Sequence, residues 1–339
     1  MSESIAGAIA MTEQPSINAG AAQGFEQRRL SLPLRIGELT LAHFVCQVLV
    51  HNEPLSASIA QQPWQLASNE QPDSEVAGYQ VKGSWVPDQQ IRMRIQGQWI
   101  HYVYSVYPRY YLDLSAGYDE YKSKFSSKSL YNLRRQRRLF FEAIKVPAAV
   151  VAARTPEEVL AFYGRAREVS RGTYQERLLQ AGLPEHEEFQ RQMMALAGAG
   201  GVRGYLLPGA DGRDAAYMYC IVQGRDVVCK YIGYDPALAK LSPGSTLLLM
   251  AIEDLFAEGA FTYFDFEEGG AQYKKQFSTA FAPCGNLLLL RNSPWNLAGM
   301  CTHRFAGVAS AFLSRTLERL GLKAALRKLL RRRAASAPT

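Results

Sequence analysis

The residues whose types and spacing suit chemistry lie between positions 231 and 275. Ser242-Pro243-Gly244-Ser245-Thr246 opens an apolar stretch and is typical of a helix start, with Ser242 as N-cap and Pro243 as first helical residue. The backbone N–H groups of residues 244–246 then have no acceptor within the helix. At the positive end of the helix dipole they can bind an anion such as a pyrophosphate, and Gly244 leaves room for one. Because every capped helix shares these features, an ordinary helix start is the alternative.

A carboxylate suited to proton transfer follows in Phe264-Asp265-Phe266. In a strand, Asp265 lies on the face opposite to the two Phe rings. If that face lines a cleft, partial desolvation raises the pKa of Asp265 and makes it a usable general base. The alternative is that Asp265 caps the following loop, and Glu267 and Glu268 are then the next candidates.

The stretch Tyr273-Lys274-Lys275 carries further polar candidates. Lys274 is placed to pair with Asp265 or to reach a phosphate. The alternative is a solvated turn in which the lysine stems cover apolar surface.

The cysteines and histidines offer no competing chemistry. Five cysteines without a C-x-x-C pair argue against a zinc site or a disulfide framework and for a reducing compartment, and we expect no metal. Cys220 and Cys229 are expected to face each other across a hairpin as small buried side chains. The five histidines are scattered and form no nucleophilic triad.

The elements that must position these residues alternate between strands and helices. Thr155, Pro156 and Glu158 predict a capping box, another helix begins at Pro184, and Gly259 ends the helix that starts at Pro243. For 146–291 the predicted order is a strand, two helices, three antiparallel strands, then helix, strand, helix and strand; the last seven of these elements span 202–207, 215–222, 226–234, 243–258, 260–266, 271–278 and 286–291.

The remainder of the chain divides by composition. Residues 1–25 are read as a disordered tail, and 26–112 are β-rich, with strands at 30–41, 42–50, 91–95 and 98–107. Residues 128–145 carry six Lys or Arg and one Glu, and residues 315–333 carry eight and one. The arginines of 134–138 can clamp phosphates or simply face solvent. The basic tail suits an anionic membrane surface, especially at 327–333, or is a terminal helix packed on the protein.

These residues resemble a known family. The element order of 146–291 is that of the GNAT acyltransferase fold, and two motifs are similar to those of CelD-type acyltransferases, which are GNAT-like proteins often associated with cellulose or exopolysaccharide production. The resemblance covers roughly residues 100–292 and departs from the family at 267–270. Its motifs are Tyr111-Leu112-Asp113-Leu114 with Tyr121, Phe125, 126–129 and 132–138, then Tyr234-Asp235-Pro236, Ser242-Pro243-Gly244, and Phe264-Asp265-Phe266 with Gly269 and Tyr273-Lys274.

The resemblance implies an α/β (α+β) GNAT fold, with a degenerate GNAT-like half at 26–112, an Arg-rich connecting helix at 113–145, a complete GNAT domain at 146–292 and a basic helical extension at 293–339. It implies that acetyl-CoA or another acyl-CoA lies between strands 226–234 and 260–266, which splay at a bulge near Gly233. Tyr231, Ile232 and Gly233 would contact this donor, and residues 242–246 its pyrophosphate. Tyr273 would protonate the departing thiolate.

We therefore expect an N- or O-acyltransferase, with Asp265, Glu267, Tyr273 and Lys274 as catalytic candidates and a small-molecule or saccharide acceptor. The expected location is cytoplasmic, at most peripheral to the inner membrane. Related Fem-type enzymes imply an alternative in which aminoacyl-tRNA is the donor, which is the one role expected for nucleic acid. A non-catalytic scaffold of a polysaccharide synthase is a third hypothesis.

Overall fold

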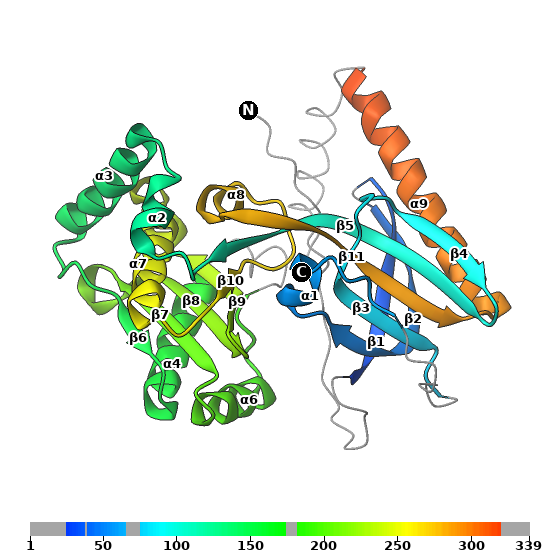
Figure 1. The fold of residues 1–339 in the computed structure, drawn as a ribbon, viewed down its shortest axis with the longest axis horizontal. Helices are drawn as coiled ribbons and strands as arrows, with labels where there is room; N and C mark the ends of the chain where they lie inside the picture. Colours follow the sequence, from blue (N-terminus) through cyan, green and yellow to red (C-terminus); the bar gives the residue numbers. More distant parts are fainter. Residues whose placement is uncertain (1–24, 38, 66–74, 174–181, 320–339) are drawn as a thin grey trace, which may run out of the picture.

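The computed structural model describes residues 25–37, 39–65, 75–173 and 182–319, and these build one mixed sheet of 11 strands (Figure 1). The strand order is β1-β2-β3-β11-β5-β10-β9-β8-β7-β6, with β4 paired to β5 alone. The predicted tail at 1–25 lies outside this description except for Phe25, and so do residues 320–339 of the predicted basic extension, which include the proposed surface-binding segment 327–333. No helix among the described residues has the length and hydropathy of a membrane span.

The second half of the sheet confirms the predicted α/β order. Its elements are β6 (Val151–Ala153), α4 (Pro156–Gly172), α6 (Glu187–Gly198), β7 (Val202–Pro208), η1 (Ala210–Gly212), β8 (Asp214–Gln223), β9 (Asp226–Tyr234), η2 (Pro236–Leu241), α7 (Pro243–Glu258), β10 (Tyr263–Asp265), α8 (Gln272–Phe277) and β11 (Ala280–Arg291). β7, β8 and β9 form the expected antiparallel meander.

Local sequence chemistry explains several of these boundaries. Thr155 and Glu158 form the predicted capping box, and Gly259 ends α7 in the left-handed conformation with φ of 64°. The start predicted at Pro184 is wrong, because α6 begins at Glu187 and the ring of His186 caps it. The strand predicted at 260–266 pairs only over Tyr263–Asp265.

The first half contains two hairpins, and three helices lie in or directly after it. Its elements are β1 (Glu26–Ile36), β2 (Leu39–Asn52), α1 (Leu55–Ile59), β3 (Gly78–Trp85), β4 (Arg92–Gln96) and β5 (Trp99–Asp113), followed by α2 (Tyr118–Ser123) and α3 (Ser127–Ile144). The turn between β1 and β2 was predicted after Leu41 and lies instead before Leu39, where Gly37 takes φ of 63°. The C-terminal helix α9 (Pro294–Arg319) packs on β1 of this half.

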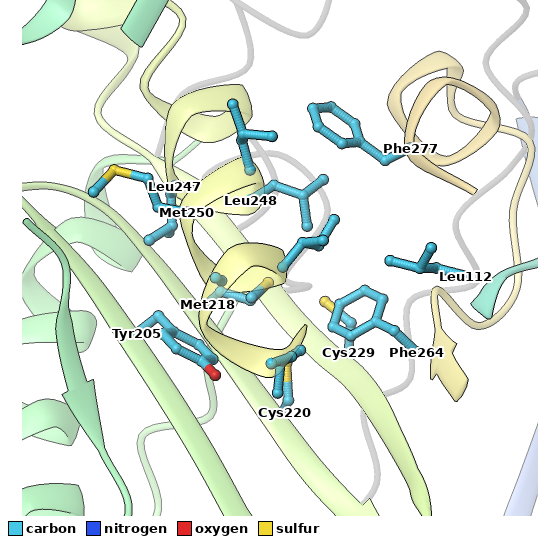
Figure 2. Close-up of a cluster of buried hydrophobic side chains, with 14 of the residues drawn as sticks. Leu112, Tyr205, Met218, Cys220, Cys229, Leu247, Leu248, Met250, Phe264 and Phe277 are labelled. Atoms are coloured by element: carbon cyan, nitrogen blue, oxygen red, sulfur yellow. The ribbon is translucent and has the colours of Figure 1, made fainter. Parts of the chain in front are cut away.

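Three of the apolar clusters among the described residues hold the layers together. The largest lies between the sheet and α3, α7 and α8; Figure 2 shows side chains of this cluster, among them Leu247, Leu248 and Met250 of α7, Phe264 and Phe277. A second core joins α4 and α6 to the opposite face of β7 and β8. The third belongs to the first half and includes residues of β1, β2, β5, β11 and α9.

β5 and β11 connect the two halves. β11 follows α8 in the chain, yet it lies between β3 and β5 and pairs along its length with both. Residues predicted to end the GNAT domain therefore complete the sheet of the first half, while the domain boundaries themselves stay a prediction.

Candidate active site

The central feature of the site is the point at which β9 and β10 part. The two strands run parallel and pair only from Asp226↔Tyr263 to Val228↔Asp265. β9 continues to Tyr234, so that, among the described residues, the backbone of 229–234 has no strand partner on that side. Such an edge presents free N–H and C=O groups to an extended ligand that carries amides.

A bulge in β9 shapes this edge. Cys220 pairs with Cys229 and Tyr219 with Tyr231, which leaves Lys230 without a partner in the ladder. The bulge was expected near Gly233 and lies at Lys230 instead. It turns Cys229 toward the largest core, beside α7, and Tyr231 toward the core beside α4 and α6. The ammonium group of Lys230 pairs with the carboxylate of Glu267.

Tyr231 and Ile232, two of the three predicted donor contacts on β9, pack their side chains inside the protein, and Gly233 leaves no room for a side chain. The Tyr231 ring stacks on Tyr219 at 6.3 Å between centroids, and Ile232 packs against the central core. At Gly233 an added Cβ would lie 2.6 Å from the Tyr217 ring. What these residues offer a ligand is therefore their backbone edge.

The start of α7 differs in detail from the prediction. Ser242 is the N-cap residue, but it has φ of 54° and its side chain makes no capping hydrogen bond. The N–H of Thr246, predicted to be free, donates to the carbonyl oxygen of Ser242 at 3.1 Å. The N–H groups of Gly244 and Ser245 have no acceptor among the described residues. The buried hydroxyl of Thr246 also has no hydrogen-bond partner there, and the ring of Tyr234 lies against Gly244.

Asp265 is fully buried and paired with Arg109. Its Oδ2 accepts hydrogen bonds from Nε and Nη2 of Arg109 at 3.0 and 2.6 Å, and its Oδ1 accepts the N–H of Glu267 at 2.8 Å. Arg109 also donates to the carbonyl oxygen of Glu53 at 2.9 Å. Burial alone lowers the pKa of Arg109, but the adjacent carboxylate raises it above its ordinary value. Asp265 thus fixes the loop after β10 to both halves of the sheet.

Glu267 presents its carboxylate at the parting of the strands. It has φ of 55°, its side chain is 34% exposed, and it pairs with Lys230 across the gap. Lys274 does not pair with Asp265. Its Nζ donates to the carbonyl oxygens of Phe266 and Glu268, each at 2.6 Å, and so holds the loop that carries Glu267. Burial lowers the pKa of Lys274.

Tyr273 lies beneath the same loop. Its ring meets Phe266 edge-on at 6.4 Å between centroids, and its hydroxyl has no hydrogen-bond partner among the residues that the structure describes. Burial raises the pKa of Tyr273, and the nearby Cys229 and Glu267 raise it further. The phenol is therefore protonated at neutral pH and carries a proton that it can donate.

Two residues of the site were missed from the sequence. Arg109 lies in the aromatic run of β5 and Lys230 in an apolar stretch of β9. A single cation among apolar strand residues is rare without a partner, which is the signal that marks both positions.

A comparison with known protein families finds a match in the middle of the chain. Residues 127–275 match a family model described as "Acetyltransferase (GNAT) domain". The chain carries a GNAT-type acetyltransferase domain. No curated protein matches the chain.

Similar solved structures include L-PGS from Bacillus licheniformis, with 13% identity, a TM-score of 0.46 and coverage of 84% of this chain and 86% of that one. FemX has 11% identity, a TM-score of 0.48 and coverage of 82% and 91%. The C-terminal domain of a putative lysylphosphatidylglycerol synthetase from Agrobacterium fabrum has 11% identity, a TM-score of 0.45 and coverage of 86% and 85%.

Proposed function

We propose that this protein transfers an acyl group from acyl-CoA to an amine or hydroxyl acceptor at the open edge of β9. The observation that carries the proposal is the parting of β9 from β10 after Val228 and Asp265, within the residues that match the GNAT model. It leaves an unpaired backbone edge next to a carboxylate, a lysine and a protonated tyrosine.

The donor would bind to two parts of the site, the edge of β9 and the start of α7. The amides of the pantetheine arm suit the free backbone edge of 229–234, because they can pair with it as a further strand does. The pyrophosphate suits the start of α7, where the N–H groups of Gly244 and Ser245 have no acceptor among the described residues and the hydroxyl of Thr246 lacks a partner. Acetyl-CoA is the donor expected first.

The reaction needs one proton acceptor and one proton donor. The acceptor nitrogen or oxygen attacks the thioester carbonyl, its proton passes to the Glu267 carboxylate, the carbon–sulfur bond breaks, and the leaving thiolate takes the proton of Tyr273. We assign the base to Glu267 because the Asp265 oxygens are fully buried and engaged with Arg109 and the Glu267 N–H. Asp265 and Lys274 hold the loop in place.

The donor site is tested by calorimetric titration with acetyl-CoA and longer acyl-CoAs. Ser245→Asp places a carboxylate in the first turn of α7, where the helix dipole stabilises its negative charge but the charge repels a pyrophosphate. Ser245→Asn is the matched neutral control. Binding by the wild type and the Asn variant that is lost in the Asp variant supports the proposal. Equal binding by all three, or no binding of any acyl-CoA, contradicts it.

A second candidate uses aminoacyl-tRNA as donor, and the exposed face of α3 favours it. Lys128, Tyr131, Arg135 and Arg138 recur at helical spacing on that face, with the Tyr131 ring 62% exposed among the cations. A basic surface with an interleaved aromatic ring suits a single-stranded nucleic acid. A cavity of 430 Å³ lies beside it; its lining residues are Arg134, Arg137, Arg138, Phe141, Glu142 and Ala148.

RNA binding to α3 is tested with the acceptor-stem end of a tRNA. Affinity that falls steeply with salt and is reduced by Arg135→Gln with Arg138→Gln supports the second candidate. RNA affinity that the two changes leave intact contradicts RNA binding by α3.

The acceptor is proposed from the CelD-like motifs alone, as a saccharide in polysaccharide biosynthesis handled in the cytoplasm. Release of free thiol from acetyl-CoA, measured with saccharide acceptors and with small amines, distinguishes this role from a non-catalytic scaffold. A scaffold binds its synthase and releases no thiol.

A further inference from the structure

The outward face of α9 is apolar and exposed. Phe305, Val308 and Phe312 recur at i, i+3 and i+7 and are 72%, 63% and 72% exposed. The spacing places all three on one stripe of the helix. Exposed aromatic side chains gathered in this way mark an interaction surface.

The opposite face of α9 is already used inside the protein. Met300 is fully buried in the core of the first half, Gly299 packs against Phe44, and Nδ1 of His303 hydrogen-bonds the Tyr102 hydroxyl at 2.8 Å. A helix that is apolar on both faces is normally buried on both. The outward stripe therefore needs a covering that the described residues do not supply.

The β1–β2 hairpin packs against the side of α9 away from this stripe. Its turn contacts α9, because Gly37 donates its N–H to the Ser310 hydroxyl at 3.0 Å and lies against Leu313. Next to the turn, Leu39 and Leu41 are 60% and 65% exposed. We name the outward stripe of Phe305, Val308 and Phe312 the α9 patch.

Charge indicates what covers the patch. Residues 301–339 contain nine Lys or Arg and one acidic residue, Glu318, which is a net charge of +8 in a chain whose total is +7. Exposed aromatic side chains beside a cluster of cations suit a surface that is apolar below and negative above. A second copy of the chain suits it poorly, because a two-fold contact would bring these two positive segments together.

We propose that the α9 patch docks this protein onto an anionic lipid membrane, with Phe305, Val308 and Phe312 entering the headgroup region and the basic C-terminal segment binding the acidic headgroups. The docking is peripheral and independent of the chemistry at β9. In Figure 1, α9 and the β1–β2 hairpin lie at the end of the molecule away from α7 and β9. A docked enzyme therefore keeps the parting of the strands clear of the bilayer.

The test is cosedimentation of the full chain with vesicles of phosphatidylcholine containing about 30 mol% phosphatidylglycerol, compared with phosphatidylcholine alone, in about 150 mM salt. Phe305→Ser with Phe312→Ser removes two anchors. Leu160→Ser with Leu196→Ser is the matched control, because it removes two exposed apolar side chains of α4 and α6 in the other half. Circular dichroism verifies that both variants fold, and light scattering gives the mass of each.

We expect the wild type and the control to bind the anionic vesicles, and the Phe305/Phe312 variant to lose about tenfold or more in partitioning. Binding that depends on charge but is equal in both variants assigns docking to the basic segment alone and overturns the role of the patch. No wild-type binding overturns the proposal, and so does a wild-type dimer that the Phe305/Phe312 change converts to a monomer.

Discussion

Replacement of Asp265 by Asn separates a structural role for this carboxylate from a catalytic one. The change keeps the shape of the side chain and removes its charge, so Arg109, whose side chain is 9% exposed, stays buried without its counter-ion. Breaking a buried ion pair by removal of one partner costs about 3–5 kcal/mol. The N–H of Glu267 also loses a carboxylate acceptor, now at 2.8 Å. We therefore expect a large loss of stability.

The assay is urea unfolding followed by circular dichroism, beside thiol release from acetyl-CoA. We expect the midpoint of Asp265→Asn to fall by more than about 1 M urea. Arg109→Met combined with Asp265→Leu, which replaces the pair by apolar side chains, should recover most of the loss. If Asp265 is instead the general base, Asp265→Asn keeps its midpoint and loses about 10²–10⁴-fold in rate. That result would refute our assignment of the base to Glu267.

Three further changes have defined outcomes. Tyr273→Phe should lower kcat by about 10²-fold and leave the thermal midpoint nearly unchanged, because its hydroxyl has no partner among the described residues; an unchanged kcat excludes it as the acid. Burial lowers the pKa of His303 from its ordinary 6.5, so the neutral buried ring stabilises the fold above pH 6.5 and this stabilisation is lost as the pH falls toward the lower folded pKa. His303→Gln should therefore make the thermal midpoint depend less on pH over that range, and an unaltered pH profile would contradict this. Gly233→Ala should cost about 1–3 kcal/mol in urea unfolding, because the new methyl group meets the Tyr217 ring, and no loss would show that the ring moves aside.

The parts of the fold that were predicted correctly depend on neighbouring residues. Thr155 with Glu158 sets the start of α4, and Pro243 and Gly259 mark the two ends of α7. Each signal acts within a few positions of the chain, where backbone conformation and capping decide the outcome. The facing of Cys220 and Cys229 follows in the same way from a short hairpin.

The parts that were missed depend on residues far apart in the chain. Arg109 and Asp265 are separated by 156 positions, so the sequence around Asp265 gave no sign that its charge is already paired. The bulge at Lys230 depends on the register of β9 against β8. The apolar pattern does not distinguish two registers one residue apart, because both faces of these strands are buried. The place of β11 beside β3 is likewise a matter of tertiary pairing, since its sequence predicts only a buried strand.

The position of β11 has a consequence for the order in which the protein can fold during synthesis. The core of the first half needs Leu288 and Leu290 of β11 and Met300 of α9, which the ribosome makes after the other described strands of the sheet. Strands β1, β2 and β3 therefore emerge early and keep an open β3 edge until β11 has been made. Over that interval the unpaired edge is exposed to wrong partners, so this half is where slow folding and dependence on chaperones should concentrate.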